Sequence, residues 1–172
     1  IIEGRTVTLT NGLSEIEAAP ESETTIVTSY FGNEVKHDLN DDGREDVAFL
    51  LTQETGGSGV FFYVVAALNT PAGYIGSQAV FLGDRIAPQT TEIHDGRAVV
   101  NFAERRADES FAVRPHIGKS VWIHLDEKNM EIGEWVKDFE GETDISRLIQ
   151  VSTPLPNQKV TNPLAVSGKA VG

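Results

Sequence analysis

The sequence of 172 residues contains no cysteine. Disulfides, thiolate nucleophiles and cysteine-ligated zinc or iron–sulfur centres are therefore excluded. Basic residues are also scarce, because 14 Lys and Arg stand against 26 Asp and Glu, which gives a formal net charge of -12. A surface of this sign repels nucleic-acid phosphates and anionic lipid headgroups and attracts cations, although net charge also keeps proteins soluble. We expect no nucleic-acid partner.

Long apolar runs are missing as well. The longest, residues 60–68, is far shorter than the roughly 20 residues that a membrane-spanning helix needs, so no transmembrane segment is expected. The chain begins without methionine and shows no signal peptide, which suggests a trimmed or mature fragment. Forty per cent of the residues are hydrophobic, which is enough to build a core, so the chain is expected to fold.

Strand signals dominate what is present. Alternating or β-branched runs predict strands at residues 6–10, 25–31, 47–52, 60–68, 74–82, 90–93, 97–102, 121–125 and 130–136. Residues 13–23 are acidic, contain a proline, and are interpreted as a loop. Since no long window shows a helical period, the sequence predicts an all-β, mostly antiparallel sandwich or barrel-like domain.

The character of the chain changes after about residue 145. Residues 151–156 and 160–171 carry Pro- and Asn-rich turns followed by an alternating apolar stretch. We therefore predict a β domain over residues 1–145, which includes the acidic hairpin loop at residues 38–46. Residues 146–172 are interpreted as a linker and the truncated start of a second domain.

The segment from residue 38 to residue 46 has the spacing of a calcium loop. Oxygen-bearing side chains stand at relative positions 1, 3, 5 and 9, occupied by Asp38, Asn40, Asp42 and Asp46. Calcium takes six to eight oxygen ligands, and a coiled loop supplies them from alternate residues. Gly43, at position 6, permits the sharp turn, and the main-chain carbonyl of Arg44, at position 7, adds a fifth ligand.

Position 12 of this loop is Phe49 instead of the glutamate that closes an EF-hand. The segment resembles the loops of integrin-type FG-GAP repeats, in which an Asp-x-Asn-x-Asp-Gly-x-x-Asp turn joins two strands, and the resemblance implies bound Ca²⁺. The alternative is a solvated acidic turn without metal. In that case the crowded carboxylates of the turn would repel one another.

Two longer resemblances extend beyond the loop. Residues 38–93, including Gly56–Gly59 and the run Gly83-Asp84-Arg85-Ile86, resemble uncharacterised bacterial envelope proteins, often lipoproteins. This resemblance implies an extracytoplasmic location, in the cell envelope or secreted, more than a function. The tail, from Ile149 through Pro163-Leu164-Ala165-Val166-Ser167-Gly168, is similar to the opening of the Gmad-type immunoglobulin-like domain.

Other candidate sites are weaker. Gly56–Gly59 lacks the Lys-Ser/Thr of a phosphate loop and leads into a strand, so it is interpreted as a hairpin connection. Glu92 and Asp95 are a candidate glycosidase pair, although acidic residues are abundant throughout the sequence. Trp122 and Trp135 would form either a sugar- or peptide-binding platform or ordinary packing.

The sequence thus favours a non-enzymatic, calcium-binding structural or binding module of a bacterial envelope or secreted protein. Its partners are a calcium ion and a protein or glycan of unknown identity. No catalytic residue is assigned. The alternative is a hydrolase that acts on polysaccharide or peptidoglycan through acidic residues, which would require a cleft lined by two carboxylates roughly 5–10 Å apart.

Overall fold

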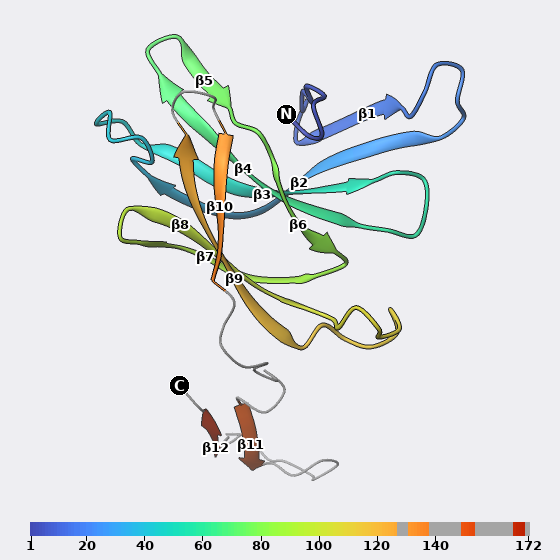
Figure 1. Cartoon of the computed structure of the whole chain (residues 1–172), viewed down its shortest axis with the longest axis vertical. Helices are drawn as coiled ribbons and strands as arrows, with labels where there is room; N and C mark the ends of the chain where they lie inside the picture. Colours follow the sequence, from blue (N-terminus) through green and yellow to red (C-terminus); the bar gives the residue numbers. More distant parts are fainter. Residues whose placement is uncertain (127–130, 138–148, 154–166, 171–172) are drawn as a thin grey trace, which may run out of the picture.

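A computed structural model shows that the chain is all-β, as the sequence predicts (Figure 1). The structure describes residues 1–126, 131–137, 149–153 and 167–170. Within these ranges every regular element is a strand, and all strand pairs are antiparallel.

Ten strands form two sheets, and a final pair forms a small third sheet. The strands are β1 (Leu13–Glu17), β2 (Thr25–His37), β3 (Asp46–Glu54), β4 (Phe61–Thr70), β5 (Gly73–Gly76), β6 (Val80–Asp84), β7 (Ala87–His94), β8 (Arg97–Glu104), β9 (Ile117–Asp126), β10 (Glu131–Lys137), β11 (Ile149–Thr153) and β12 (Ser167–Ala170). The first sheet runs β1-β2-β3-β4-β5, with β6 also paired to β4, and it curls into a half-barrel. The second sheet runs β10-β9-β8-β7.

The main core lies between these two sheets. Leu50 of β3, Val64 of β4 and Val100 of β8 are completely buried, and Phe102 of β8 is 1% exposed. These residues belong to one apolar cluster that both sheets supply. Alternating residues of each strand reach the cluster because side chains point to opposite faces of a sheet in turn.

The opposite face of β3 and β4 is also buried. Leu51, Tyr63 and Val65 form a second apolar cluster there. It is covered by the segment that precedes β1, because Ile2 belongs to this cluster and Val7 packs against it. The continuous apolar runs at residues 47–52 and 60–68 thus belong to strands that are buried on both faces.

Three local predictions differ from the structure. Residues 13–17, part of the acidic segment predicted as loop, form strand β1, because they pair in register with the first five residues of β2. Residues 6–10, predicted as a strand, join no sheet ladder and make only an isolated bridge between Thr10 and Leu13. The strand predicted at residues 74–82 is interrupted between β5 and β6, where Ser77 bonds to Ala66 of β4 through both its backbone and its hydroxyl.

The tail is described only at β11 and β12, which pair with each other. Residues 154–166, which include much of the predicted immunoglobulin-like opening, lie outside the described residues. In the described part of the chain no helix is long and apolar enough to cross a membrane. The boundary near residue 145 stays a prediction.

Ending the chain after residue 145 should leave the two-sheet domain folded. Both apolar clusters lie within residues 2–125, and β11 pairs, among the described strands, with β12 alone. Circular dichroism and thermal melting of the shortened chain check this, with the full chain as reference. A shortened chain that is unfolded, or that melts over a broad non-cooperative range, would show that the tail belongs to the main core.

Candidate cation-binding loop

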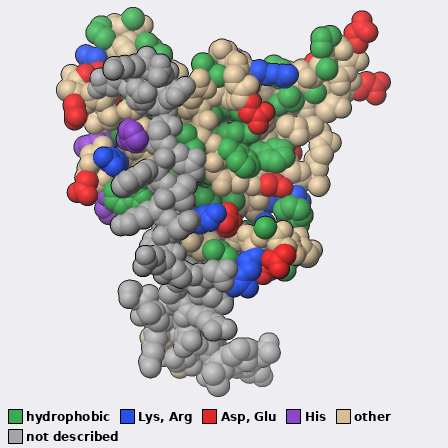
Figure 2. Space-filling view, in the orientation of Figure 1, with side chains coloured by type: hydrophobic (Ala, Val, Ile, Leu, Met, Phe, Trp, Pro, Cys, Tyr) green, Lys and Arg blue, Asp and Glu red, His purple; other side chains and the backbone are tan. Residues whose placement is uncertain are grey.

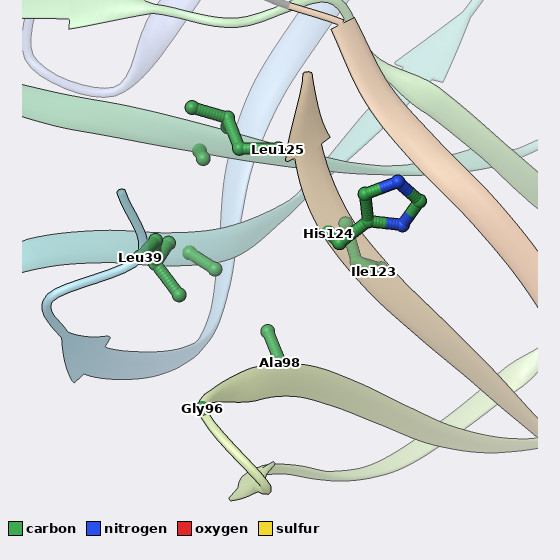
Figure 3. Close-up of a pocket in the computed structure, with 8 residues that line it drawn as sticks. Leu39, Gly96, Ala98, Ile123, His124 and Leu125 are labelled. Atoms are coloured by element: carbon green, nitrogen blue, oxygen red, sulfur yellow. The ribbon is translucent and has the colours of Figure 1, made fainter. Parts of the chain in front are cut away.

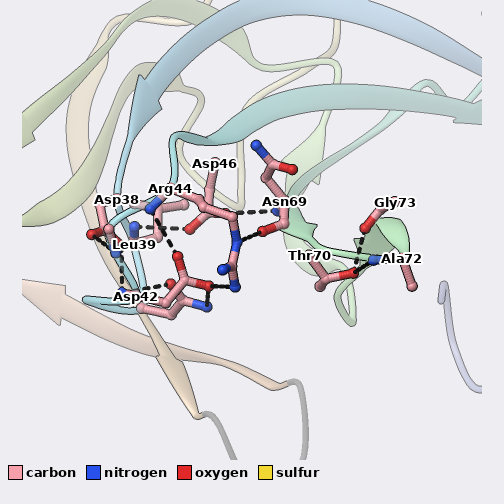
Figure 4. Close-up of polar contacts among 11 residues, drawn as sticks. Asp38, Leu39, Asp42, Arg44, Asp46, Asn69, Thr70, Ala72 and Gly73 are labelled. Carbon is pink, nitrogen blue, oxygen red and sulfur yellow. Dashed lines mark hydrogen bonds and ion pairs between the residues drawn. The ribbon is translucent and has the colours of Figure 1, made fainter.

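The predicted loop joins the end of β2 to the start of β3, at one end of the first sheet (Figure 4). Two of its residues adopt left-handed backbone conformations, Asp41 with φ of 58° and Gly43 with φ of 82°. Asp tolerates this region through its short polar side chain, and Gly has no Cβ to clash. These two positions coil the chain tightly enough for the side chains of residues 38 and 40 to accept from the same backbone N–H, that of Asp42.

Asp38 begins the loop and accepts two hydrogen bonds from its backbone. The N–H of Asp42 donates to Oδ1 at 3.0 Å, and the N–H of Gly43 donates to Oδ2 at 2.7 Å. Loss of water contact opposes ionisation of Asp38, but these donors, led by Gly43, outweigh it and lower the pKa of the carboxyl below its ordinary value. Oδ1 of Asn40 accepts from the same Asp42 N–H at 3.3 Å.

Asp42 lies at the centre of the loop, and its carboxylate is shared among three donors. Oδ1 accepts from the N–H of Arg44 at 2.9 Å, and Oδ2 accepts from the amide group of Asn40 at 3.1 Å. The guanidinium of Arg44 also forms an ion pair with Oδ2. Oδ2 of Asp42, a proposed calcium ligand, is therefore already paired with the positive side chain of Arg44.

Asp46 ends the loop and differs from the other three side chains because it is only 1% exposed. Its Oδ2 accepts from the N–H of Leu39 at 3.0 Å, and its Oδ1 accepts from the N–H of Asn69, in β4, at 2.8 Å. The carbonyl of Asn69 in turn accepts from Nε of Arg44. Asp46 and Arg44 thus fasten the loop to the end of β4.

The structure brings the predicted residues together in two groups. Asp38 and Asn40 accept from the same N–H, that of Asp42, and the Asn40 amide donates to the Asp42 carboxylate. The carboxylate of Asp46 instead accepts from the N–H groups of Leu39 and Asn69. Across the described ranges no group of three or more His, Asp or Glu side chains is arranged to hold a metal. The repulsion expected among the carboxylates is offset by backbone N–H groups and by Arg44, so crowding alone does not require a cation.

Leu39 connects the loop to the main core. Its side chain packs against the cluster between the sheets and lines a small cavity of about 30 Å³ (Figure 3). Ala48, Ala66 and Ala98 line the same cavity. A volume of this order holds little more than a water molecule, and the lining is mostly apolar. The cavity is therefore a packing defect at one end of the core between the two sheets, and it is too small for a substrate.

The hydrolase alternative depends on carboxylates outside the loop. Glu92 accepts from the hydroxyl of Thr90 at 2.6 Å and contacts Nε2 of His94 at 3.1 Å. The Thr90 hydroxyl, followed by His94, lowers the pKa of Glu92, whereas a glycosidase acid requires a raised pKa. Trp122 is half-buried, with its ring 6.0 Å from that of His94, and it pairs in register with Trp135.

No protein-family model, curated protein or solved structure matches the chain. The resemblances to FG-GAP loops, envelope proteins and the Gmad-type domain therefore stay predictions. Leu39 and Asn69 are the loop contacts that the sequence did not indicate, because neither the apolar Leu39 nor the distant Asn69 belongs to the ligand spacing.

Replacing Asp46 by alanine should destabilise the protein even when calcium is chelated. The change leaves the N–H groups of Leu39 and Asn69 without an acceptor, and we expect a loss of about 2–4 kcal/mol in the free energy of unfolding. Urea denaturation in the presence of chelator measures it. The neighbouring and exposed Glu45→Ala is the control and should change stability by at most about 0.5 kcal/mol. Equal losses for the two variants would contradict the role assigned to Asp46.

Acid should weaken the loop through Asp38. Because its pKa is lowered in the folded state, its carboxylate contributes stability above its ordinary pKa of 3.8, and this contribution is lost as the pH falls through the lower folded value. In chelator, the melting temperature of the unaltered protein should therefore fall more steeply below about pH 4 than that of Asp38→Asn. Asp41→Asn, which removes an equal charge, should follow the unaltered protein.

Proposed function

We propose that the chain is a non-enzymatic, calcium-stabilised structural or binding module of a bacterial envelope or secreted protein. The ligands are the side chains of Asp38, Asn40, Asp42 and Asp46 and the carbonyl of Arg44. The observation that carries the proposal is that Oδ1 of Asp38 and Oδ1 of Asn40 lie within hydrogen-bonding distance of one N–H group. Oxygens at the first two ligand positions are thereby gathered on one side of the turn.

The donor set fits a hard cation. All five groups are carboxylate, amide or carbonyl oxygens, which calcium and magnesium prefer over nitrogen or sulfur ligands. A bound calcium ion would neutralise the acidic turn and link its two ends. Each carboxylate oxygen has more than one lone pair, so an oxygen that accepts an N–H bond retains capacity for a cation.

The surrounding charge favours the same conclusion. Residues 1–82, which hold β1 to β5 and most of β6, carry twelve acidic and three basic side chains. Cations are therefore concentrated around this sheet. The backbone donors that lower the pKa of Asp38 favour its ionised form, which is the form that binds a cation.

Arg44 limits the affinity. Its guanidinium holds the carboxylate of Asp42, and an entering cation must replace or share that contact. Position 12 also supplies no carboxylate. Both features favour weak binding, in the range of about 10⁻⁴–10⁻³ M that suits extracellular calcium modules. An extracytoplasmic location is consistent with an affinity of this order.

The competing hydrolase is less well supported. Among the hollows that described residues line, one is the small, mostly apolar cavity next to Leu39, and two others are each lined by a single carboxylate, Glu3 or Glu15. Hydrolysis of a glycosidic bond requires two carboxyl groups that flank the substrate. The low pKa of Glu92 argues against it as the acid.

Calcium should raise the melting temperature, because a ligand that binds only the folded state stabilises it by mass action. The gain is about 2.7 kcal/mol when free calcium exceeds its dissociation constant a hundredfold. Differential scanning calorimetry in millimolar calcium and in chelator measures the shift. Asp42→Ala should abolish it.

Glu45→Ala is the matched control, since it removes one acidic side chain from the same loop but no ligand. It should retain the calcium response. Identical melting curves with calcium and with chelator would overturn the proposal, and so would an equal reduction of the response by both variants, because that would reflect charge alone.

A further inference from the structure

The segment before β1 begins a β-hairpin that does not close. Asn11 and Gly12 have φ values of 52° and 81°, which suits a tight hairpin turn. On either side of the turn, Thr10 and Leu13 exchange two backbone hydrogen bonds, of 2.8 and 3.2 Å. Residues 6–10, which we call the arm, then separate from β1, and no further pair forms between them.

The register shows which hydrogen bonds are missing. Continuing the hairpin from Thr10 and Leu13 would pair Thr8 with Glu15 and Thr6 with Glu17. Along β1 the backbone N–H and C=O groups of successive residues point to opposite edges of the strand. The even-numbered residues direct theirs at β2, so Glu15 and Glu17 direct theirs away from β2. The carbonyl of Gly12 accepts from Tyr30, and the N–H of Ala18 donates to Thr24.

The arm is held away from β1 by its own apolar side chains. Val7 and Leu9 pack against the second apolar cluster, on the face of β3 and β4. The threonines of the arm are exposed and face β1 across an open groove of about 530 Å³, which Leu13 and Glu15 line on the other side. An adjoining hollow of about 280 Å³ is lined by Ile16, Ile26 and Gln53 and also by one acidic and one basic residue, Glu3 and Arg5.

We propose that this groove is an acceptor for an extended, basic segment of a partner protein, which pairs with the outward edge of β1. Such a segment would bond to the free backbone groups of Glu15 and Glu17 by strand addition. Among the described strands, none other than β2 pairs with β1. The adjoining hollow takes an apolar side chain of the incoming segment against Ile16 and Ile26.

Charge selects the partner. The strand carries Glu15 and Glu17, and the turn that follows it carries Glu21 and Glu23, all of them exposed. Figure 2 shows acidic side chains at the tip of a projection of the surface. Opposite charges on facing strands stabilise a pair, and like charges directly opposite destabilise it. A second copy pairing through its own β1 would bring these glutamates together, so a lysine- or arginine-bearing segment fits better.

The proposal is independent of cation binding. β1 pairs with Thr25–Ser29, the first residues of β2, whereas the loop follows His37, the last. Loss of the calcium response would therefore leave this inference intact, and the reverse also holds.

The probe is an acetylated and amidated hexapeptide of alternating lysine and valine, titrated against the full chain in chelator and followed by isothermal calorimetry and amide hydrogen exchange. We expect saturable binding and slower exchange of the Glu15 and Glu17 amides. Alternating glutamate and valine should bind at least about tenfold more weakly. Glu15→Pro, which removes an outward N–H and leaves the pairing of Ser14 and Ile16 with β2 intact, should also weaken binding about tenfold.

A second variant does not rely on proline being tolerated. Glu15→Lys combined with Glu17→Lys keeps the backbone and should reverse the preference, so that the glutamate peptide binds more tightly than the lysine peptide. Absence of binding to the unaltered chain, binding without protection of the Glu15 and Glu17 amides, or an unchanged preference in the double variant would each overturn the proposal. So would pairing of two copies through β1, detected as concentration-dependent protection of these amides without peptide.

Discussion

The two-sided burial of β3 and β4 is the constraint that organises this fold. Leu50 and Val64 face one apolar cluster, and Leu51 and Val65 face the other. A sheet that is apolar on both faces requires a cover on each. The second sheet supplies one cover, with Val100 at its centre. The other comes from the segment that precedes β1, through the buried Ile2 and through Val7 and Leu9 of the arm.

The position of the arm follows from a competition between hydrophobic burial and hydrogen bonding. Burying a Val or Leu side chain contributes at most about 1.5–3 kcal/mol, and a backbone hydrogen bond exchanged with water contributes a net of about 0.5–1.5 kcal/mol. Closing the hairpin would add two paired positions, Thr8 with Glu15 and Thr6 with Glu17, but would draw the half-buried Val7 and Leu9 away from the apolar cluster. The two contributions are of similar size, and in the open form of the structure the apolar contacts are kept while the unmade hydrogen bonds remain accessible to water.

This competition explains which parts of the fold the sequence predicts. The sequences of β3, β4 and β8 predict these strands by themselves, since a continuous apolar run is buried whichever strands it pairs with. The arm and β1 are mispredicted because local patterning is overruled there by tertiary contacts. Residues 6–10 alternate like a strand but serve as a cover, and residues 13–17 resemble a polar loop but find a partner in β2.

The loop shows the same division between local and distant information. Ligand spacing and Gly43 predict the tight turn, and the contacts among Asp38, Asn40 and Asp42 follow from that spacing. The role of Asp46 does not follow from that spacing, because its Oδ1 accepts from the N–H of Asn69, which is 23 residues away. Asp46 is therefore both a proposed ligand and a structural joint between the loop and β4. A cation bound at this loop would reinforce a connection that the protein already makes, which favours a stabilising role for calcium over a switch between two conformations.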